Sequence, residues 1–212
     1  MNKKAFTLVE VLLAMTVVGI IAVVTMNSLS NISANKTKMT FQNNYKHMIE
    51  VIDAIVTDET IYPRIELDSL DINGRTERVT MCNYDSGLFP REFVNHTKVM
   101  TQTEITGGFS FETSTGSFWV VRRNPEQANC SRDGEGDYVI IFDVNGRGEG
   151  TDCPYTGADL STESEGTCSN PDTFKFFLGA GTRTVVMDDA LKYNSSDLYN
   201  YTLNNNYLNF NY

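Results

Sequence analysis

The chain begins with MNKKAFTLVEVLLAMTVVGIIAVV, residues 1–24, and this stretch decides how the rest of the sequence is read. From Phe6 onward its only charged residue is Glu10, and two lysines precede the apolar run. A helix over residues 6–26, with a rise of about 1.5 Å per residue, is long enough to cross a hydrocarbon core of about 30 Å. The run is too long for a secretory signal peptide, and no A-x-A cleavage site closes it. Because the lysines favour a cytoplasmic start, we expect the chain after residue 27 to lie outside the inner membrane.

Glu10 is unusual in this setting, because a carboxylate inside a membrane costs a few kcal/mol and calls for a partner. Residues 6–26 contain no Lys, Arg or His. One cationic group would arise nearby if the chain were cut after Ala5, namely a new α-amino group on Phe6. Between parallel helices displaced along their axes, that amine could meet the carboxylate of a neighbour. Such a pair would set the register of an assembly, as a lone polar residue does in a coiled-coil core.

The segment KKAFTLVEVLLAM resembles the leader and cleavage site of type IV pilins and type II secretion pseudopilins. In that family a prepilin peptidase removes the leader, and the new N-terminal Phe is usually methylated. The resemblance implies cleavage between Ala5 and Phe6, N-methylation of Phe6, and pairing of Glu10 with the N-terminus of a neighbour. Gly19 lies where many members have a glycine that softens the helix. The sequence departs from the family at Ala5, where glycine is nearly invariable, and it lacks the proline that many pilins carry later in this helix.

The resemblance implies a structural subunit of a type IV filament, either a pilus or a secretion pseudopilus, and not an enzyme. Its implied partners are copies of itself, other pilins or pseudopilins, the prepilin peptidase and an inner-membrane assembly platform. It would be held in the bacterial inner membrane by one span and then pass into a periplasmic or extracellular filament. Two alternatives stay open: a minor tip subunit that binds a surface, DNA or a secreted substrate, and a membrane-anchored protein of another activity.

Composition and motifs limit the other classes of function. The formal net charge is −10 and the pI is about 4.6, which disfavours nucleic acid as the main partner because phosphate binding needs clustered Lys and Arg. No G-x-S-x-G, H-E-x-x-H or Walker motif occurs in the sequence, so no catalytic residue is predicted.

The rest of the chain predicts an α+β fold, in which a long N-terminal helix packs on an antiparallel β-sheet head, as in a pilin-like roll. We expect a leader over 1–5, a transmembrane or filament-core helix over 6–26, an amphipathic continuation over 27–60, and a globular head over 61–212. Apolar residues recur every three or four positions in the continuation, which indicates one buried stripe. The stripe comprises Phe41, Tyr45, Met48, Ile49, Ile52, Ile55 and Val56. Strands are predicted over 78–82, 98–105, 109–113, 118–122, 138–144, 173–178 and 182–187.

Four cysteines, Cys82, Cys130, Cys153 and Cys168, occur in the predicted head. An even count outside the inner membrane predicts two disulfides, for which three pairings exist. Pairing Cys153 with Cys168 closes a short loop and leaves Cys82 with Cys130. A zinc site is disfavoured, because there is no C-x-x-C pair and both histidines are far from any cysteine in the sequence.

The segment FDVNGRGEGTDC, residues 142–153, is a candidate calcium loop. Asp143, Asn145 and Asp152 would supply the oxygen ligands that Ca²⁺ prefers, next to a turning glycine. The pattern departs from an EF-hand loop at Arg147, and no Glu closes it. The alternative is a surface turn rich in Asn, Gly and Asp, in which the arginine pairs with a carboxylate. No other cofactor is expected.

Overall fold

The computed structural model describes residues 8–62, 81, 85–127, 136–147, 155–156, 160, 162–163, 171–180 and 185–188. The side chains at positions 8, 10–11, 19–35, 156 and 162–163 lie outside that description. Backbone contacts divide the chain into two units, Met1–Thr40 and Phe41–Tyr212.

Helix α1 spans Leu8–Thr57 and contributes to both units. Its C-terminal end is fixed by Asp58, whose carboxylate Oδ1 accepts hydrogen bonds from the backbone N–H and the hydroxyl of Thr60, at 2.8 and 2.7 Å. The N–H of Tyr62 donates to the carbonyl of Asp58 at 2.9 Å, which turns the chain away just before Pro63.

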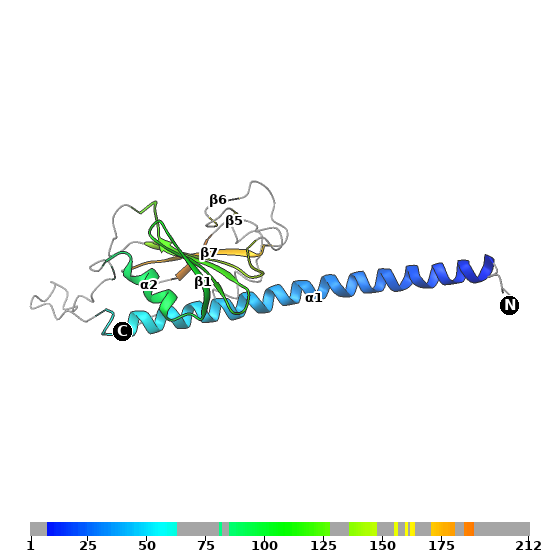
Figure 1. The fold of residues 1–212 in the computed structure, drawn as a ribbon, viewed down its shortest axis with the longest axis horizontal. Helices are drawn as coiled ribbons and strands as arrows, with labels where there is room; N and C mark the ends of the chain where they lie inside the picture. The colour runs from blue at the N-terminus through cyan, green and yellow to red at the C-terminus, as the bar shows by residue number, and fades with distance from the viewer. Residues whose placement is uncertain are drawn as a thin grey trace, which may run out of the picture. The chain divides into compact units, whose positions relative to one another are not determined.

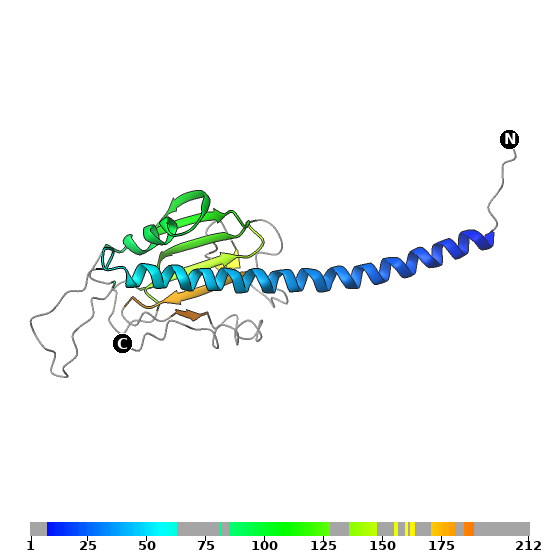
Figure 2. The same cartoon turned by 90° about the horizontal axis from the view of Figure 1, so that it is seen from below.

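The second unit is built on a six-stranded sheet in the order β1-β2-β3-β4-β7-β8, with every neighbouring pair antiparallel (Figures 1 and 2). Its strands are β1 Val99–Ile105, β2 Gly108–Thr113, β3 Phe118–Arg123, β4 Tyr138–Asp143, β7 Thr173–Leu178 and β8 Val185–Met187. A two-stranded pair, β5 Tyr155–Thr156 and β6 Thr162–Glu163, lies between β4 and β7 in the sequence. The predicted α+β class is therefore confirmed.

An aromatic row crosses four adjacent strands on the face that receives helix α1. The register aligns Phe111 of β2 with Trp119 of β3, Trp119 with Phe142 of β4, and Phe142 with Phe174 of β7. Phe41 of α1 packs on this row, with its ring centroid 4.5 Å from that of Phe174 and 5.7 Å from that of Phe142. Cross-strand aromatic pairs stabilise a sheet beyond the area they bury, so this row is the centre of the core.

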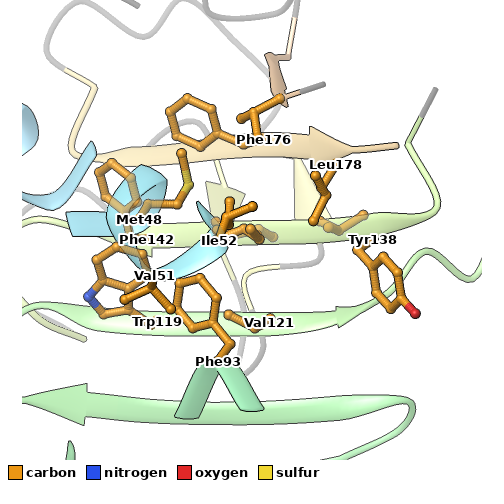
Figure 3. Close-up of a cluster of buried hydrophobic side chains, with 14 of the residues drawn as sticks. Met48, Val51, Ile52, Phe93, Trp119, Val121, Tyr138, Phe142, Phe176 and Leu178 are labelled. Atoms are coloured by element: carbon orange, nitrogen blue, oxygen red, sulfur yellow. The ribbon is translucent and has the colours of Figure 1, made fainter. Parts of the chain in front are cut away.

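The apolar stripe predicted along residues 41–56 is confirmed: every member of it is buried, with at most 5% of its surface exposed. Figure 3 shows Met48, Val51 and Ile52 of α1 among Trp119, Phe142 and other side chains that rise from the sheet. The spacing of three and four residues places these side chains on one side of the helix, and the apolar face of the sheet covers them.

Helix α2, Leu88–Asn95, was not predicted from the sequence. It has only eight residues and contains Pro90, which usually marks a break. Pro90 lies in the first turn, however, where a backbone N–H has no partner within the helix, so the proline is tolerated. Phe89 and Phe93 project from it into the core and are wholly buried.

The predicted strands over 98–105, 109–113, 118–122, 138–144 and 173–178 are confirmed to within one residue at each end. The strand predicted over 182–187 is observed over Val185–Met187, and its earlier residues lie outside the described ranges. Of the strand predicted over 78–82, the structure describes only Met81, which does not belong to a strand.

Candidate functional site

The N-terminal part of α1 carries large apolar side chains that are exposed in the described part of the chain. Their exposed fractions are 71% for Val9, 59% for Leu12, 67% for Leu13, 72% for Met15, 48% for Val17 and 65% for Val18. Apolar surface on this scale is unfavourable in water, and it is typical of segments that contact other protein or lipid.

The residues predicted to act in processing and assembly are only partly described. Ala5 and Phe6 lie outside the described residues. Glu10 and Gly19 lie within the backbone of helix α1, but their side chains are outside the description. Their roles therefore stay predictions.

The membrane prediction is not confirmed by the described part of the chain. Over the residues whose placement is described, no helix combines the length and the apolar character needed to span a membrane. The segment predicted over 6–26 includes positions outside that set, and it stays a prediction.

A second group of functional candidates lies where strand β4 ends and strand β7 begins. Asp143 is fully buried at the end of β4, and its carboxylate Oδ1 accepts a hydrogen bond from the backbone N–H of Asn145 at 3.0 Å. Asp172, which is 6% exposed, precedes β7 and accepts a hydrogen bond from the Asn145 side-chain amide at 3.4 Å. The sequence did not point to Asp172, because it follows Asn145 by 27 residues and only the pairing of β4 with β7 brings them together.

The turn after β4 has the backbone that its sequence predicts. Gly146 has a φ of +91°, which side-chain-bearing residues rarely adopt, and a Cβ there would lie 2.6 Å from the carbonyl oxygen of Gly116. The guanidinium carbon of Arg147 lies 5.6 Å from the centroid of the Phe118 ring, in a cation–π arrangement. The close approach of Gly146 to Gly116 and the contact of Arg147 with Phe118 pack this turn against the turn between β2 and β3.

The metal and disulfide predictions are not tested by these residues. Asp152 and all four cysteines, Cys82, Cys130, Cys153 and Cys168, lie outside the described ranges. Within those ranges, no group of three or more His, Cys, Asp or Glu side chains is placed to hold a metal ion. Asp143 and Asp172 remain as two buried carboxylates beside the amide of Asn145.

Among the described residues, the pKa values of His47, Tyr138 and Asp58 are shifted. The pKa of His47 is lowered, because burial against the sheet outweighs the opposite effect of the Glu50 carboxylate. Burial raises the pKa of Tyr138 to about 12. Hydrogen bonds from Thr60 lower the pKa of Asp58.

Comparison with known proteins gives one positive result. Residues 1–26 match the family model described as the prokaryotic N-terminal methylation motif. No curated protein and no solved structure matches the chain.

Proposed function

Because residues 1–26 carry the methylation motif that is the signature of type IV pilins and pseudopilins, we propose that this chain is a structural subunit of a type IV filament. Proteins with this signature are in general processed by a prepilin peptidase and assemble with other pilins. The subunit would be anchored in the bacterial inner membrane by residues 6–26 and then enter a pilus or a secretion pseudopilus.

The observation that carries the proposal is the uncovered apolar surface of α1 in a segment that also bears the motif. Side chains such as Leu13 and Met15 are 67% and 72% exposed, so an isolated subunit leaves them without an apolar partner. Lipid would cover them before assembly, and the equivalent helices of other subunits would cover them afterwards.

Glu10 would give the assembly its register. Cleavage after Ala5 creates an α-amino group on Phe6, and this cation would pair with the Glu10 carboxylate of a neighbouring helix. In an apolar surrounding the loss of either charge leaves the other unpaired, which is strongly unfavourable. The pair thus penalises wrong registers more than it strengthens the right one.

The test is the substitution Glu10→Val in the full chain, expressed in its host. We expect membrane insertion to be normal or improved, because a charge is removed from an apolar segment, while incorporation into filaments falls at least tenfold. Asp53→Val is the matched control, since it removes an exposed carboxylate from the same helix within the head. Normal amounts of filament in the Glu10→Val strain would contradict the role assigned to Glu10.

The same preparation separates this role from that of a scarce tip subunit. If purified filaments consist mainly of this chain, it is a major subunit. If the chain is present at a few copies per filament, the tip-subunit alternative is favoured.

A further inference from the structure

Trp119 and His47 meet where helix α1 packs on the sheet. Trp119 lies on β3 in the aromatic row, and Figure 3 shows it beside Val51 and Phe142 under the helix. The imidazole of His47 meets the indole of Trp119 nearly at right angles, with an interplanar angle of 88° and 6.3 Å between ring centroids. His47 is partly buried and Trp119 is fully buried.

The surroundings of this contact are apolar. The indole of Trp119 also packs against Phe93 of α2, Phe111 of β2 and Phe142 of β4, at centroid distances of 5.9, 6.2 and 4.8 Å. Its Nε1–H is buried and has no hydrogen-bond partner among the described residues. On this side, a protonated His47 would therefore lose hydrating water and find no hydrogen-bond acceptor to replace it.

Within the described part of the chain, the charge that shifts the pKa of His47 lies on its own helix. Glu50 favours the imidazolium, but its carboxylate also forms an ion pair with Lys46, with 3.7 Å between Nζ and Oε1. Phe93, Phe111 and Phe142, the described side chains that pack around Trp119, carry no charge. Desolvation is the larger effect and lowers the pKa of His47 from its ordinary value of 6.5.

We propose that His47 and Trp119 form a pH-sensitive contact that stabilises the packing of α1 on the sheet only while the imidazole is neutral. A group whose pKa is lower in the folded state than in the unfolded state stabilises the fold at pH values above its unfolded-state pKa. This stabilisation is lost as the pH falls through the folded-state pKa. The head is therefore expected to loosen below pH 6.5, at the face where α1 covers the aromatic row. This device is independent of the proposed filament role.

The composition of the chain makes the contact directly measurable. Trp119 is the only tryptophan, and His47 and His96 are the only histidines. A protonated imidazole beside an indole quenches its fluorescence, so the emission of Trp119 reports the titration of His47.

The experiment follows tryptophan emission of the full chain in detergent from about pH 8 to about pH 4.5, across the range in which histidine titrates. The wild-type protein should show a transition with a midpoint below 6.5. His96→Gln, which changes the exposed histidine, should keep that transition. His47→Gln and His47→Phe should both lose the transition. His47→Phe is included because it keeps a ring against Trp119, in case the loss of the ring in His47→Gln weakens folding.

The urea midpoint provides the second readout. In the wild-type protein it should fall between about pH 7.5 and about pH 5 by more than it does in His47→Phe, in which all carboxylates are retained. A transition that persists in both His47 variants, a midpoint above 6.5, or equal urea shifts would overturn the proposal. A midpoint above 6.5 would mean that attraction between the imidazolium and the indole face exceeds the cost of burial.

Discussion

The side-chain amide of Asn44 donates a hydrogen bond of 2.9 Å to the hydroxyl oxygen of Ser117, although 73 residues separate them in the sequence. Asn44 lies on α1 and Ser117 lies in the turn between β2 and β3, and both are buried. The bond therefore fixes the helix relative to one end of the sheet, in a way that apolar packing alone would not.

Replacing Asn44 by Ala should lower the free energy of unfolding by about 1–3 kcal/mol, because the hydroxyl of Ser117 is left buried without its donor. Urea unfolding of the full chain in detergent measures the change. The double variant Asn44→Ala/Ser117→Ala should be less destabilised than the sum of the two single variants. Strict additivity would show that the two side chains do not interact.

Phe142 of the aromatic row packs against rings of α1 and of both neighbouring strands. It is fully buried, and its ring centroid lies between 4.8 and 5.7 Å from those of Phe41, Trp119, Phe174 and Phe176. Phe142→Ala should lower the free energy of unfolding by about 3–5 kcal/mol through lost burial and the cavity left behind. Met100→Ala is the control, because Met100 is 71% exposed on β1 and its loss should cost no more than about 0.5 kcal/mol. Similar losses in the two variants would mean that the core is not centred on this row.

Lys175 on β7 forms a partly buried ion pair with Asp188, with 3.3 Å between Nζ and Oδ2 and side-chain exposures of 24% and 19%. Its ammonium also lies 4.8 Å from the ring centroid of Phe177 and 5.3 Å from that of Tyr155. Lys175→Met should lower the free energy of unfolding by about 1–3 kcal/mol, since the partner carboxylate loses its cation in a poorly hydrated place.

The matched control for Lys175 is Lys46→Met, which breaks the ion pair with Glu50 on the surface of α1, where the side chains are 71% and 62% exposed. Its cost should stay within about 0.5 kcal/mol, because water screens an exposed pair. An equal effect of the two substitutions on the urea midpoint would contradict the distinction drawn between the pairs.

The loop after β4 is proposed to bind calcium through Asp143 and Asn145, with Asp152 and the newly located Asp172 as further oxygen ligands. Asp143 and Asp172 are 0% and 6% exposed and lie beside the Asn145 amide, and carboxylate and amide oxygens are the donors that a divalent cation such as Ca²⁺ prefers. Calcium at about 100 times its dissociation constant should add about 2.7 kcal/mol of stability to the wild-type protein. The same addition should leave Asp143→Asn unchanged, while the control Asp53→Asn keeps the gain. Identical melting temperatures of the wild-type protein in calcium and in EDTA would contradict the proposal.

Periodicity and turn chemistry were sufficient to predict the described helix–sheet core. The recurrence of apolar residues from Phe41 to Val56 indicated the buried side of α1, and strand-type segments such as 138–144 indicated the strands of the sheet. Helix α2 was missed because it is short and contains Pro90, whose tolerance depends on its place in the first turn. Asp172 was missed because strand order is a tertiary property: β7, not β5, pairs with β4. The contact of His47 with Trp119 was missed for the same reason.

If the first residues form a processed filament signal, the mass of the N-terminal peptide of the mature protein will show it. The protein should be isolated from membranes of its own host and digested, and its first peptide identified by mass spectrometry. We expect a chain that begins at Phe6 with a methylated α-amino group, which requires cleavage after Ala5. A chain that retains Met1 to Ala5 would contradict the account, and residues 6–26 would then be an unprocessed anchor.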